Sequence, residues 1–259
     1  MTPLQHAGQV RLRTRLADGP GDVAAAQALR YEVFVRELGA GGACHAHLPG
    51  QEADAFDPHA DHLLLEDLAR DDGTVVGVYR MMNRSQAIAA GRFSSAHEFD
   101  LTPLLASGRP LLELGRSCLL PAYRGGPAMM HLFAGVAQHV AAQPDTLLFG
   151  VASFHGTDTA RLTAPLALLH SDHLAPPGLR PHAIGPHAIP MPVAAPADRK
   201  AALRAIPPLI KAYLRLGSVV GDGACVDPGF NTTDVCMMLD AAMMTADQRA
   251  RLWPPRGSS

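Results

Sequence analysis

The stretch Leu111–Ala128, LLELGRSCLLPAYRGGPA, joins a predicted strand to a predicted helix through a glycine-containing turn. Its apolar first half is typical of a strand buried within a sheet, and Pro127–Ala142 has the spacing of a helix. Gly125 and Gly126 let the backbone approach a ligand closely, and free N–H groups at the start of a helix favour a phosphate. With Arg124 beside it, the turn is a candidate anion site, although an ordinary strand-to-helix connection has the same pattern.

The regions around this unit predict further strands and helices. Alternating polarity predicts a strand at Gln9–Ala17, and a helix follows between Asp22, as its cap, and Gly39. The long loop Ala40–Ala60 suggests a functional lid or binding loop. The other expected elements are strands at His62–Asp67 and Thr74–Met82, an irregular excursion at 83–110, a strand at Leu147–Ser153, a helix at Asp158–His170, a surface insertion or linker between His173 and Pro196, a helix near Pro208–Leu216 and a strand near Thr233–Asp240. This order indicates an α/β protein with a mixed sheet flanked by helices.

The composition excludes several classes of protein. The chain has 259 residues, 47% of them hydrophobic, and no apolar window approaches the roughly 18 residues of a membrane-spanning helix. The N-terminus lacks the apolar core of a secretory signal, so we expect a cytoplasmic protein. A net charge of −2 argues against a nucleic-acid partner. The four cysteines form no CxxC pair, which predicts reduced, mostly buried thiols and no metal site.

The tetrapeptide Glu113-Leu114-Gly115-Arg116 places a carboxylate inside the apolar strand. A buried carboxylate is costly, so Glu113 is expected to be paired or to act as a base. Strand geometry puts Glu113 and Arg116 on opposite faces unless a bulge intervenes. A structural ion pair, for example with Arg80, is the alternative role for Glu113.

Four separated blocks resemble the pattern shared by acyl-homoserine-lactone synthases and N-acyl amino acid synthases. In chain order they are LRYEVFVRELG at 29–39, DAFD at 54–57, YRMM at 79–82 and ELGR at 113–116. The resemblance implies a GNAT-like fold, in which a splayed strand pair and an Arg/Gly-rich turn hold phosphopantetheine. Here the phosphopantetheine-binding residues would be Leu119, Arg124, Gly125 and Gly126.

The last third of the chain is similar to the ornithine-lipid branch of these families, the L-ornithine Nα-acyltransferases. The similar segments are PLIKAYLRLG at 208–217, GDGACVDP at 221–228 and NTTDV at 231–235. Homoserine-lactone synthases are expected to be shorter and to lack this part. The resemblance, over about residues 10–240, implies one GNAT-like domain spanning 1–259 with a family-specific extension from about 173. It also implies transfer of a 3-hydroxyacyl chain from acyl carrier protein to the α-amino group of L-ornithine, giving lyso-ornithine lipid.

The chemistry of this transfer assigns a role to Glu113. An amine is mostly protonated at pH 7 and cannot attack a thioester until a base removes its proton. Glu113 is the candidate base, directly or through one water, and backbone N–H groups near Leu119 or in the 124–126 turn would stabilise the oxyanion. No cofactor is implied, because the acylated carrier protein is itself the donor substrate. The residues that the resemblance places near the acceptor, as substrate-binding residues, are Arg30, Phe34, Asp54, Asp57, Arg80 and Arg116.

Two other functions fit the same pattern. One is an N-acyl amino acid synthase with another acceptor, such as glutamine or glycine, and the other is a silent module that only binds acyl carrier protein. The segment Ile206–Val220, with Arg204, Lys211 and Arg215, could lie on the inner face of the cytoplasmic membrane, dock an acidic carrier or form an ordinary core helix. The HxxxxD spacing of His62–Asp67 is read as accidental, because residues five apart in a strand point to opposite faces.

Overall fold

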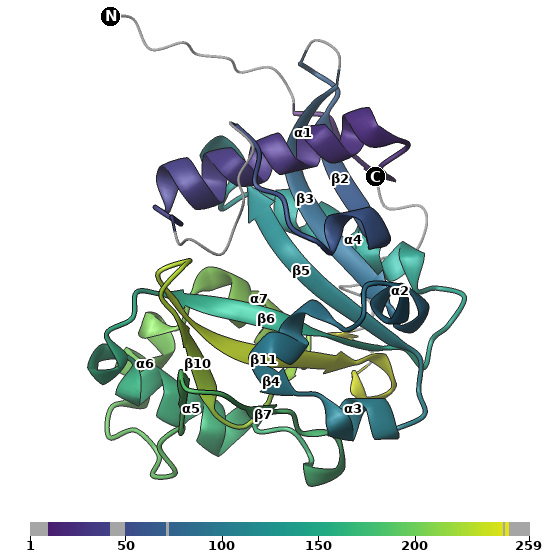
Figure 1. The fold of residues 1–259 in the computed structure, drawn as a ribbon. Coiled ribbons are helices and arrows are strands. Elements are labelled where there is room, and N and C mark those ends of the chain that lie inside the picture. The colour runs from purple at the N-terminus through teal and green to yellow at the C-terminus, as the bar shows by residue number, and fades with distance from the viewer. Residues whose placement is uncertain (1–9, 42–49, 71–72, 246, 249–259) are drawn as a thin grey trace, which may run out of the picture.

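One large sheet runs through the molecule, and helices cover both of its faces (Figure 1). The structure is a computed structural model that describes residues 10–41, 50–70, 73–245 and 247–248. β9 (Val219–Val220) pairs with β11 beside the main path of the sheet, and β4 (Phe99–Asp100) and β7 (His182–Ala183) form a separate pair. Across the sheet the strands are β1 (Leu12–Leu16), β2 (Asp61–Asp67), β3 (Thr74–Asn83), β5 (Leu111–Leu119), β6 (Leu147–His155), β11 (Thr232–Asp240), β10 (Ala224–Asp227) and β8 (Ala188–Ile189).

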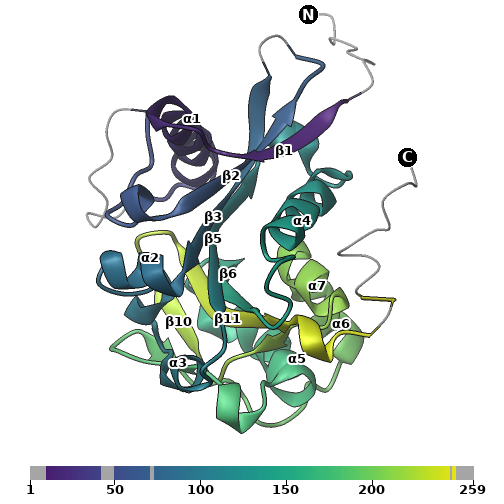
Figure 2. The same cartoon turned by 90° about the vertical axis from the view of Figure 1, so that its right-hand side faces the viewer.

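The helices pack against the sheet through their apolar sides. α1 and α4 lie on opposite faces of the β1–β3 region, as Figure 2 shows, and α7 contacts β6 and β11. None of the helices formed by the described residues has the length and apolar character needed to cross a bilayer. The helices are α1 (Pro20–Arg30), which continues as a π-helix over Tyr31–Glu37, α2 (Arg84–Ala89), α3 (Thr102–Ala106), α4 (Ala128–His139), α5 (Thr163–His173), α6 (Arg199–Ala205) and α7 (Pro208–Arg215).

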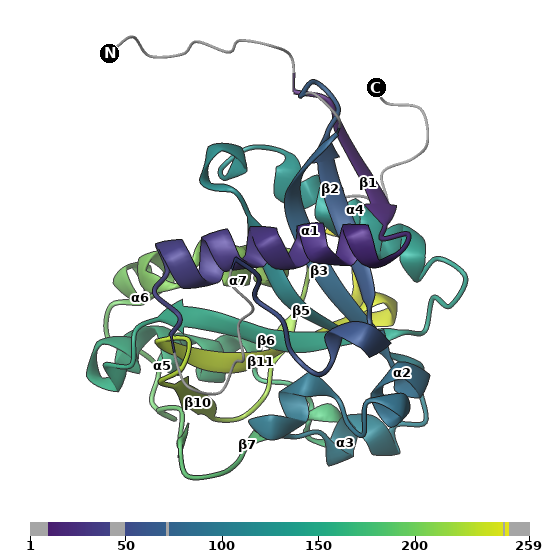
Figure 3. The ribbon, with the colours of Figure 1, turned by 45° about the horizontal axis from the view of Figure 1, so that its top comes forward.

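The predicted splayed strand pair is formed by β5 and β6. These two parallel strands pair only where 111–113 face 147–149, and then run apart (Figure 3). At the point of separation Gly150 passes so close to the carbonyl oxygen of Leu114 that a side chain there would collide with it. Glycine is therefore required at this position, because the two backbones must touch before they diverge.

A bulge in β5 changes which way its side chains point. Tyr79 of β3 lies opposite two residues of β5, because Val78 pairs with Cys118 while Arg80 pairs with Gly115. Within the bulge Arg116 has a φ of 52°, a left-handed conformation that is uncommon for a residue other than glycine. The bulge brings Arg116 to the same face of the sheet as Arg80, so the regular alternation does not apply here.

Several expectations about the elements need correction. The stretch 83–110 is not irregular, because it contains α2, β4 and α3. The region 173–196 is not a linker, since β7 pairs with β4 and β8 pairs with β10. The first helix is capped by Gly19, and Asp22 instead accepts a hydrogen bond from the N–H of Asp18 and pairs with Arg15. Gln9, Cys44 and residues 42–49 of the long loop lie outside the described residues.

The C-terminal third is part of the central sheet. β11 pairs with β6 at nine positions and thereby joins β10 and β8 to the strands that precede them in the chain. α7 carries Ile210, which is fully buried, while the ammonium group of Lys211 bonds to the carbonyl oxygen of Arg204. The segment 206–220 therefore contains a core helix with a basic outer edge.

Candidate active site

A buried network of three arginines and three carboxylates connects the end of α1 to β3 and β5. Arg30, with none of its surface exposed, bonds to both Glu52 and Asp57. Arg80 bonds to Asp54 and, at 2.9 Å, to Asp57. The resemblance predicts that Arg30 and Arg80 bind the substrate. In the structure their guanidinium groups bond to carboxylates of the network, and both side chains are buried. These ion pairs hold the segment around 50–57 against the sheet.

Arg116 lies at the edge of this network and is partly exposed. Its guanidinium bonds to Glu52 at 3.1 Å and to Asp54 at 3.0 Å, and it lies 5.0 Å above the ring of Phe230. Phe34 meets the same ring edge-on, with 6.0 Å between ring centroids. Of the six predicted substrate-binding residues, Arg116, Asp54 and Phe34 are partly exposed, whereas Arg30, Asp57 and Arg80 are buried.

The network is balanced in charge. Burial opposes ionisation of Asp57, but hydrogen bonds and charge from Arg30, together with the charge of Arg80, hold the pKa of its carboxyl well below the usual range. The pKa of Asp54 is lowered in the same way, against the effect of burial, by Arg80 and Arg116. Nearby, burial lowers the pKa of His62, whose Nε2 lies 3.1 Å from the carbonyl oxygen of Asp57. His62 is therefore a neutral structural residue.

Glu113 lies beside the network without pairing with any of its arginines. Its carboxylate accepts hydrogen bonds from the N–H of Ser94 at 2.9 Å, the N–H of Ser95 at 2.6 Å and the hydroxyl of Ser95. Arg80 does not bond to Glu113; on this side its guanidinium bonds to the hydroxyl of Ser94, at 3.3 Å. The ion pair between Glu113 and Arg80 is therefore not formed. One oxygen, Oε2, receives a single one of these bonds and retains acceptor capacity.

The glycine-containing turn leads into α4 as predicted, but Arg124 is already paired within the chain. Its guanidinium bonds to Glu37 at 2.6 and 2.7 Å, and its Nε donates to the carbonyl oxygen of Leu119 at 3.0 Å. Gly125, at a φ of 75°, and Gly126 are exposed. The first turn of α4 has no side-chain cap, so the turn keeps N–H groups that face outward.

A small apolar cavity lies where β5 and β6 separate. It is lined by Leu114, Phe149, Gly150, Tyr213, Met238 and Leu239. Beneath it the hydroxyl groups of Tyr79 and Tyr213 bond to each other, and burial raises the pKa of Tyr79 to about 12. Both tyrosines therefore stay neutral and act as a polar seam in the core.

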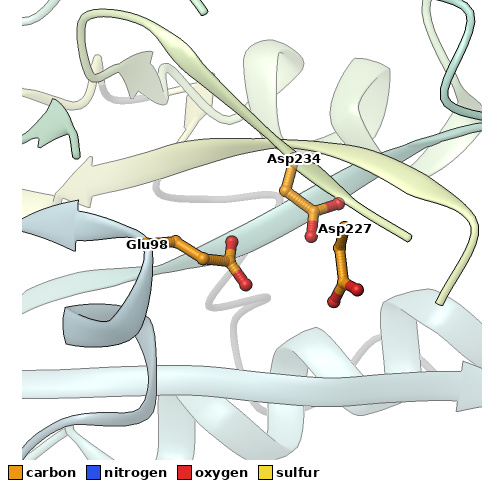
Figure 4. A group of neighbouring side chains, drawn as sticks. All are labelled: Glu98, Asp227 and Asp234. Atoms are coloured by element: carbon orange, nitrogen blue, oxygen red, sulfur yellow. The ribbon is translucent and has the colours of Figure 1, made fainter. Parts of the chain in front are cut away.

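Sequence reasoning missed a second group of charged residues on the same face of the sheet as Glu113. The carboxylates of Glu98, Asp227 and Asp234 have oxygen atoms within 4.8 Å of one another (Figure 4). Burial, with the charges of Asp234 and Asp227, raises the pKa of Glu98 to about 8, and burial raises the pKa of Asp234 to about 6. Carboxylate oxygens are ligands for hard cations, so this acidic cluster could hold a metal ion or an ammonium group. A signal was available in part, because Asp227 and Asp234 lie in the segments GDGACVDP and NTTDV.

Known proteins resemble this chain in fold and in sequence. Residues 29–134 match the family model described as an acetyltransferase (GNAT) domain. The fold is that of the AHL synthase LasI, at a TM-score of 0.52 and 13% identity over 97% of this chain and 99% of that one. It is equally that of FeeM, an N-acyl amino acid synthase from uncultured soil microbes, at a TM-score of 0.51 and 11% identity over 94% and 96%.

The fold and the splayed strands are thus those of a GNAT domain. Two relatives give the family. An L-ornithine N(alpha)-acyltransferase of Rhodobacter capsulatus is 50% identical over 94% of this chain and 95% of the relative. Another, of Brucella abortus, is 39% identical over 88% of this chain and 84% of the relative. The chain belongs to the L-ornithine N(alpha)-acyltransferase family.

Proposed function

We propose that this protein transfers a 3-hydroxyacyl group from acyl carrier protein to the α-amino group of L-ornithine, forming lyso-ornithine lipid. The relatives that match over nearly their full length are named for the same acceptor and the same nitrogen. The structural observation that carries the proposal is the position of Glu113, a carboxylate with a free acceptor site where β5 and β6 separate.

In the proposed reaction Glu113 removes a proton from the α-ammonium group of the acceptor. The amine nitrogen then attacks the thioester carbonyl carbon, the new C–N bond forms, and the C–S bond breaks. Glu113 releases this first proton to solvent, takes the second proton from the nitrogen as the C–N bond forms, and returns that second proton to the departing thiolate, so that one proton is released overall. The two N–H groups of Ser94 and Ser95 keep the Glu113 carboxylate in place during this exchange.

The donor arm is proposed to enter along the 119–126 turn. The N–H groups of Tyr123 and Arg124 already bond to the carbonyl oxygens of Leu120 and Pro121. Gly125 and Gly126 are therefore the better candidates to contact the phosphate of phosphopantetheine, and Arg124 would reach it only by leaving Glu37. The thioester is a substrate, so the proposal needs no bound cofactor.

The partners in this proposal are acyl carrier protein, L-ornithine and, transiently, a membrane surface at the inner face of the cytoplasmic membrane. The product carries an acyl chain and partitions into a bilayer, which is the reason to expect brief peripheral contact. The carrier, the membrane contact and the cytoplasmic location rest on this chemistry. The family assignment sets aside the alternative of a silent carrier-binding module.

The test is thiol release from 3-hydroxyacyl-acyl carrier protein by the purified protein. We expect release with L-ornithine, none without an acceptor, and a product of the mass of lyso-ornithine lipid. Release that depends on another amino acid, such as glutamine or glycine, would show that this amino acid, and not L-ornithine, is the acceptor. Release with 3-hydroxyacyl-coenzyme A at the same efficiency would contradict the carrier-protein donor.

The variant Glu113→Gln tests the proposed base. We expect turnover to fall at least about 100-fold, because general-base catalysis contributes about that much or more. The amide would face the donors of Ser94 and Ser95, so thermal unfolding must show that the variant is folded. Unchanged turnover in a folded variant would remove Glu113 from the mechanism.

A further inference from the structure

The acidic cluster of Glu98, Asp227 and Asp234 is assembled by three parts of the fold. Asp234 points from β11 to the face of the sheet where Cys236 and Met238 pack beneath the segment 93–101. That segment carries Glu98, whose N–H bonds to the carbonyl oxygen of Ser95 at 3.1 Å. The short turn that holds the Glu113 carboxylate therefore also positions the carboxylate of Glu98.

Two of these carboxylates have a buried oxygen atom without a hydrogen-bond partner. Asp234 is only 4% exposed and its Oδ1 has none, and the same is true of Oε2 of Glu98. Figure 4 shows the carboxylates of Glu98 and Asp234 directed toward each other. Asp227 is fixed by the N–H groups of Gly229 and Phe230, which bond to its Oδ1 at 2.7 and 3.1 Å. A buried acceptor without a donor is costly, so the site is built as though a donor were to arrive.

The acidic cluster lacks an ion-pair partner within the part of the chain that the structure describes. Among the ion pairs between described residues, none involves any of the three carboxylates. Arg116 attracts Glu98 and Asp234 from a distance, but its guanidinium already bonds to Glu52 and Asp54. No cation among the described residues bonds to the cluster, so a cationic ligand would supply a donor to these oxygens.

We propose that the acidic cluster binds the side-chain ammonium group of the acceptor amino acid while its α-amino group faces Glu113. The inference rests on the proposed function and gives it a specificity-determining site. An ammonium group has three N–H donors and no acceptor, which suits three convergent carboxylates. One short turn positions both Glu113 and Glu98, because the N–H groups of Ser94 and Ser95 bond to the Glu113 carboxylate and the N–H of Glu98 bonds to the carbonyl oxygen of Ser95. A neutral acceptor would leave the buried oxygens of Glu98 and Asp234 unpaired, which would disfavour it.

The test compares L-ornithine with L-norvaline, which has the same carbon chain without the terminal amine. With the wild-type protein and 3-hydroxyacyl-acyl carrier protein, kcat/KM for ornithine should exceed that for norvaline by about 10- to 100-fold, the range of a charge-assisted hydrogen bond. Asp234→Asn should remove most of this preference by lowering kcat/KM for ornithine far more than kcat/KM for norvaline. Asp222→Asn, which neutralises a carboxylate in the same part of the chain outside the cluster, should change neither.

Several outcomes would overturn the inference. An equal loss with both acceptors in Asp234→Asn would place the cluster at the α-amino group or in the framework. A preference for ornithine that needs added Mg²⁺ or Ca²⁺ and disappears with a chelator would make it a metal site.

Calorimetry of ornithine and norvaline binding to the free wild-type protein separates this inference from the proposed function. Equal affinities would contradict the ammonium site whatever the enzyme acylates. Conversely, selective binding of ornithine without its acylation would contradict the proposed function and leave the site in place.

Discussion

The arginine network and the acidic cluster use the same kinds of carboxylate on one face of one sheet, but they differ in charge balance. In the network, three arginines face Glu52, Asp54 and Asp57, and against the effect of burial they lower the pKa of both aspartates. In the cluster, none of the described arginines bonds to the three carboxylates, and burial raises the pKa of both Glu98 and Asp234. A buried charge with a partner belongs to the framework, whereas a buried charge without one indicates where a ligand is bound.

The largest effect is expected on breaking the network. Asp57→Asn leaves Arg30 and Arg80 with one carboxylate fewer inside the protein, and removing one partner of a buried ion pair costs about 3–5 kcal/mol. The free energy of unfolding in urea should fall by about this amount. Asp158→Asn, at a mostly exposed carboxylate, is the matched control and should change it by less than about 0.5 kcal/mol. Similar losses in the two variants would contradict a structural role for the network.

A smaller effect on the free energy of unfolding is expected from the acidic cluster as the pH changes. The folded protein holds a proton on Glu98 up to about pH 8, whereas the unfolded chain releases it near the ordinary value of 4.5. Between these values the folded state binds more protons, so the contribution of Glu98 to stability falls as the pH rises. Asp227, Asp234, Arg116 and Glu113 all act on this titration.

Urea unfolding at several pH values between 5 and 8 measures this effect. The difference between wild type and Glu98→Gln cancels other groups, including His62, whose lowered pKa acts in the opposite direction. The wild type should lose stability relative to the variant as the pH rises. If the difference in the free energy of unfolding between the two proteins does not change with pH, the pKa of Glu98 is not raised in the folded protein.

The patterns that could be read from the sequence are those that depend on neighbours along the chain. The strand, turn and helix of 111–139 follow from local apolar spacing and from the glycines at the turn. The blocks with Arg30, Asp54–Asp57, Arg80 and Arg116 were expected together, and the network joins them. The four-block resemblance made this possible, because the four blocks are far apart in the sequence.

The remaining features depend on tertiary contacts. The side of β5 on which Arg116 lies depends on a bulge opposite Tyr79, which the alternation of residues does not reveal. Glu98 lies in a stretch without periodicity, and it meets Asp227 and Asp234 only because that stretch folds over β10 and β11. An acidic site formed from three distant segments leaves no spacing pattern in the sequence.

The smallest effect is expected at the exposed ion pair between Arg124 and Glu37. The two side chains are 40% and 34% exposed, so Arg124→Ala should lower the free energy of unfolding by less than about 1 kcal/mol. If the turn binds phosphopantetheine, KM for the acylated carrier should rise while KM for ornithine stays the same. A loss of stability as large as that of Asp57→Asn would show that exposure does not separate these pairs.

Thermal unfolding of Asp57→Asn and Asp234→Asn, each with and without L-ornithine, tests the difference between the two groups most directly. Without ligand, Asp57→Asn should melt below the wild type, and Asp234→Asn should melt above it because a repelling buried charge is gone. Added ornithine should raise the Tm of the wild type and fail to raise that of Asp234→Asn. A lower Tm in both variants, with the ornithine effect intact in Asp234→Asn, would contradict a framework network beside a binding cluster.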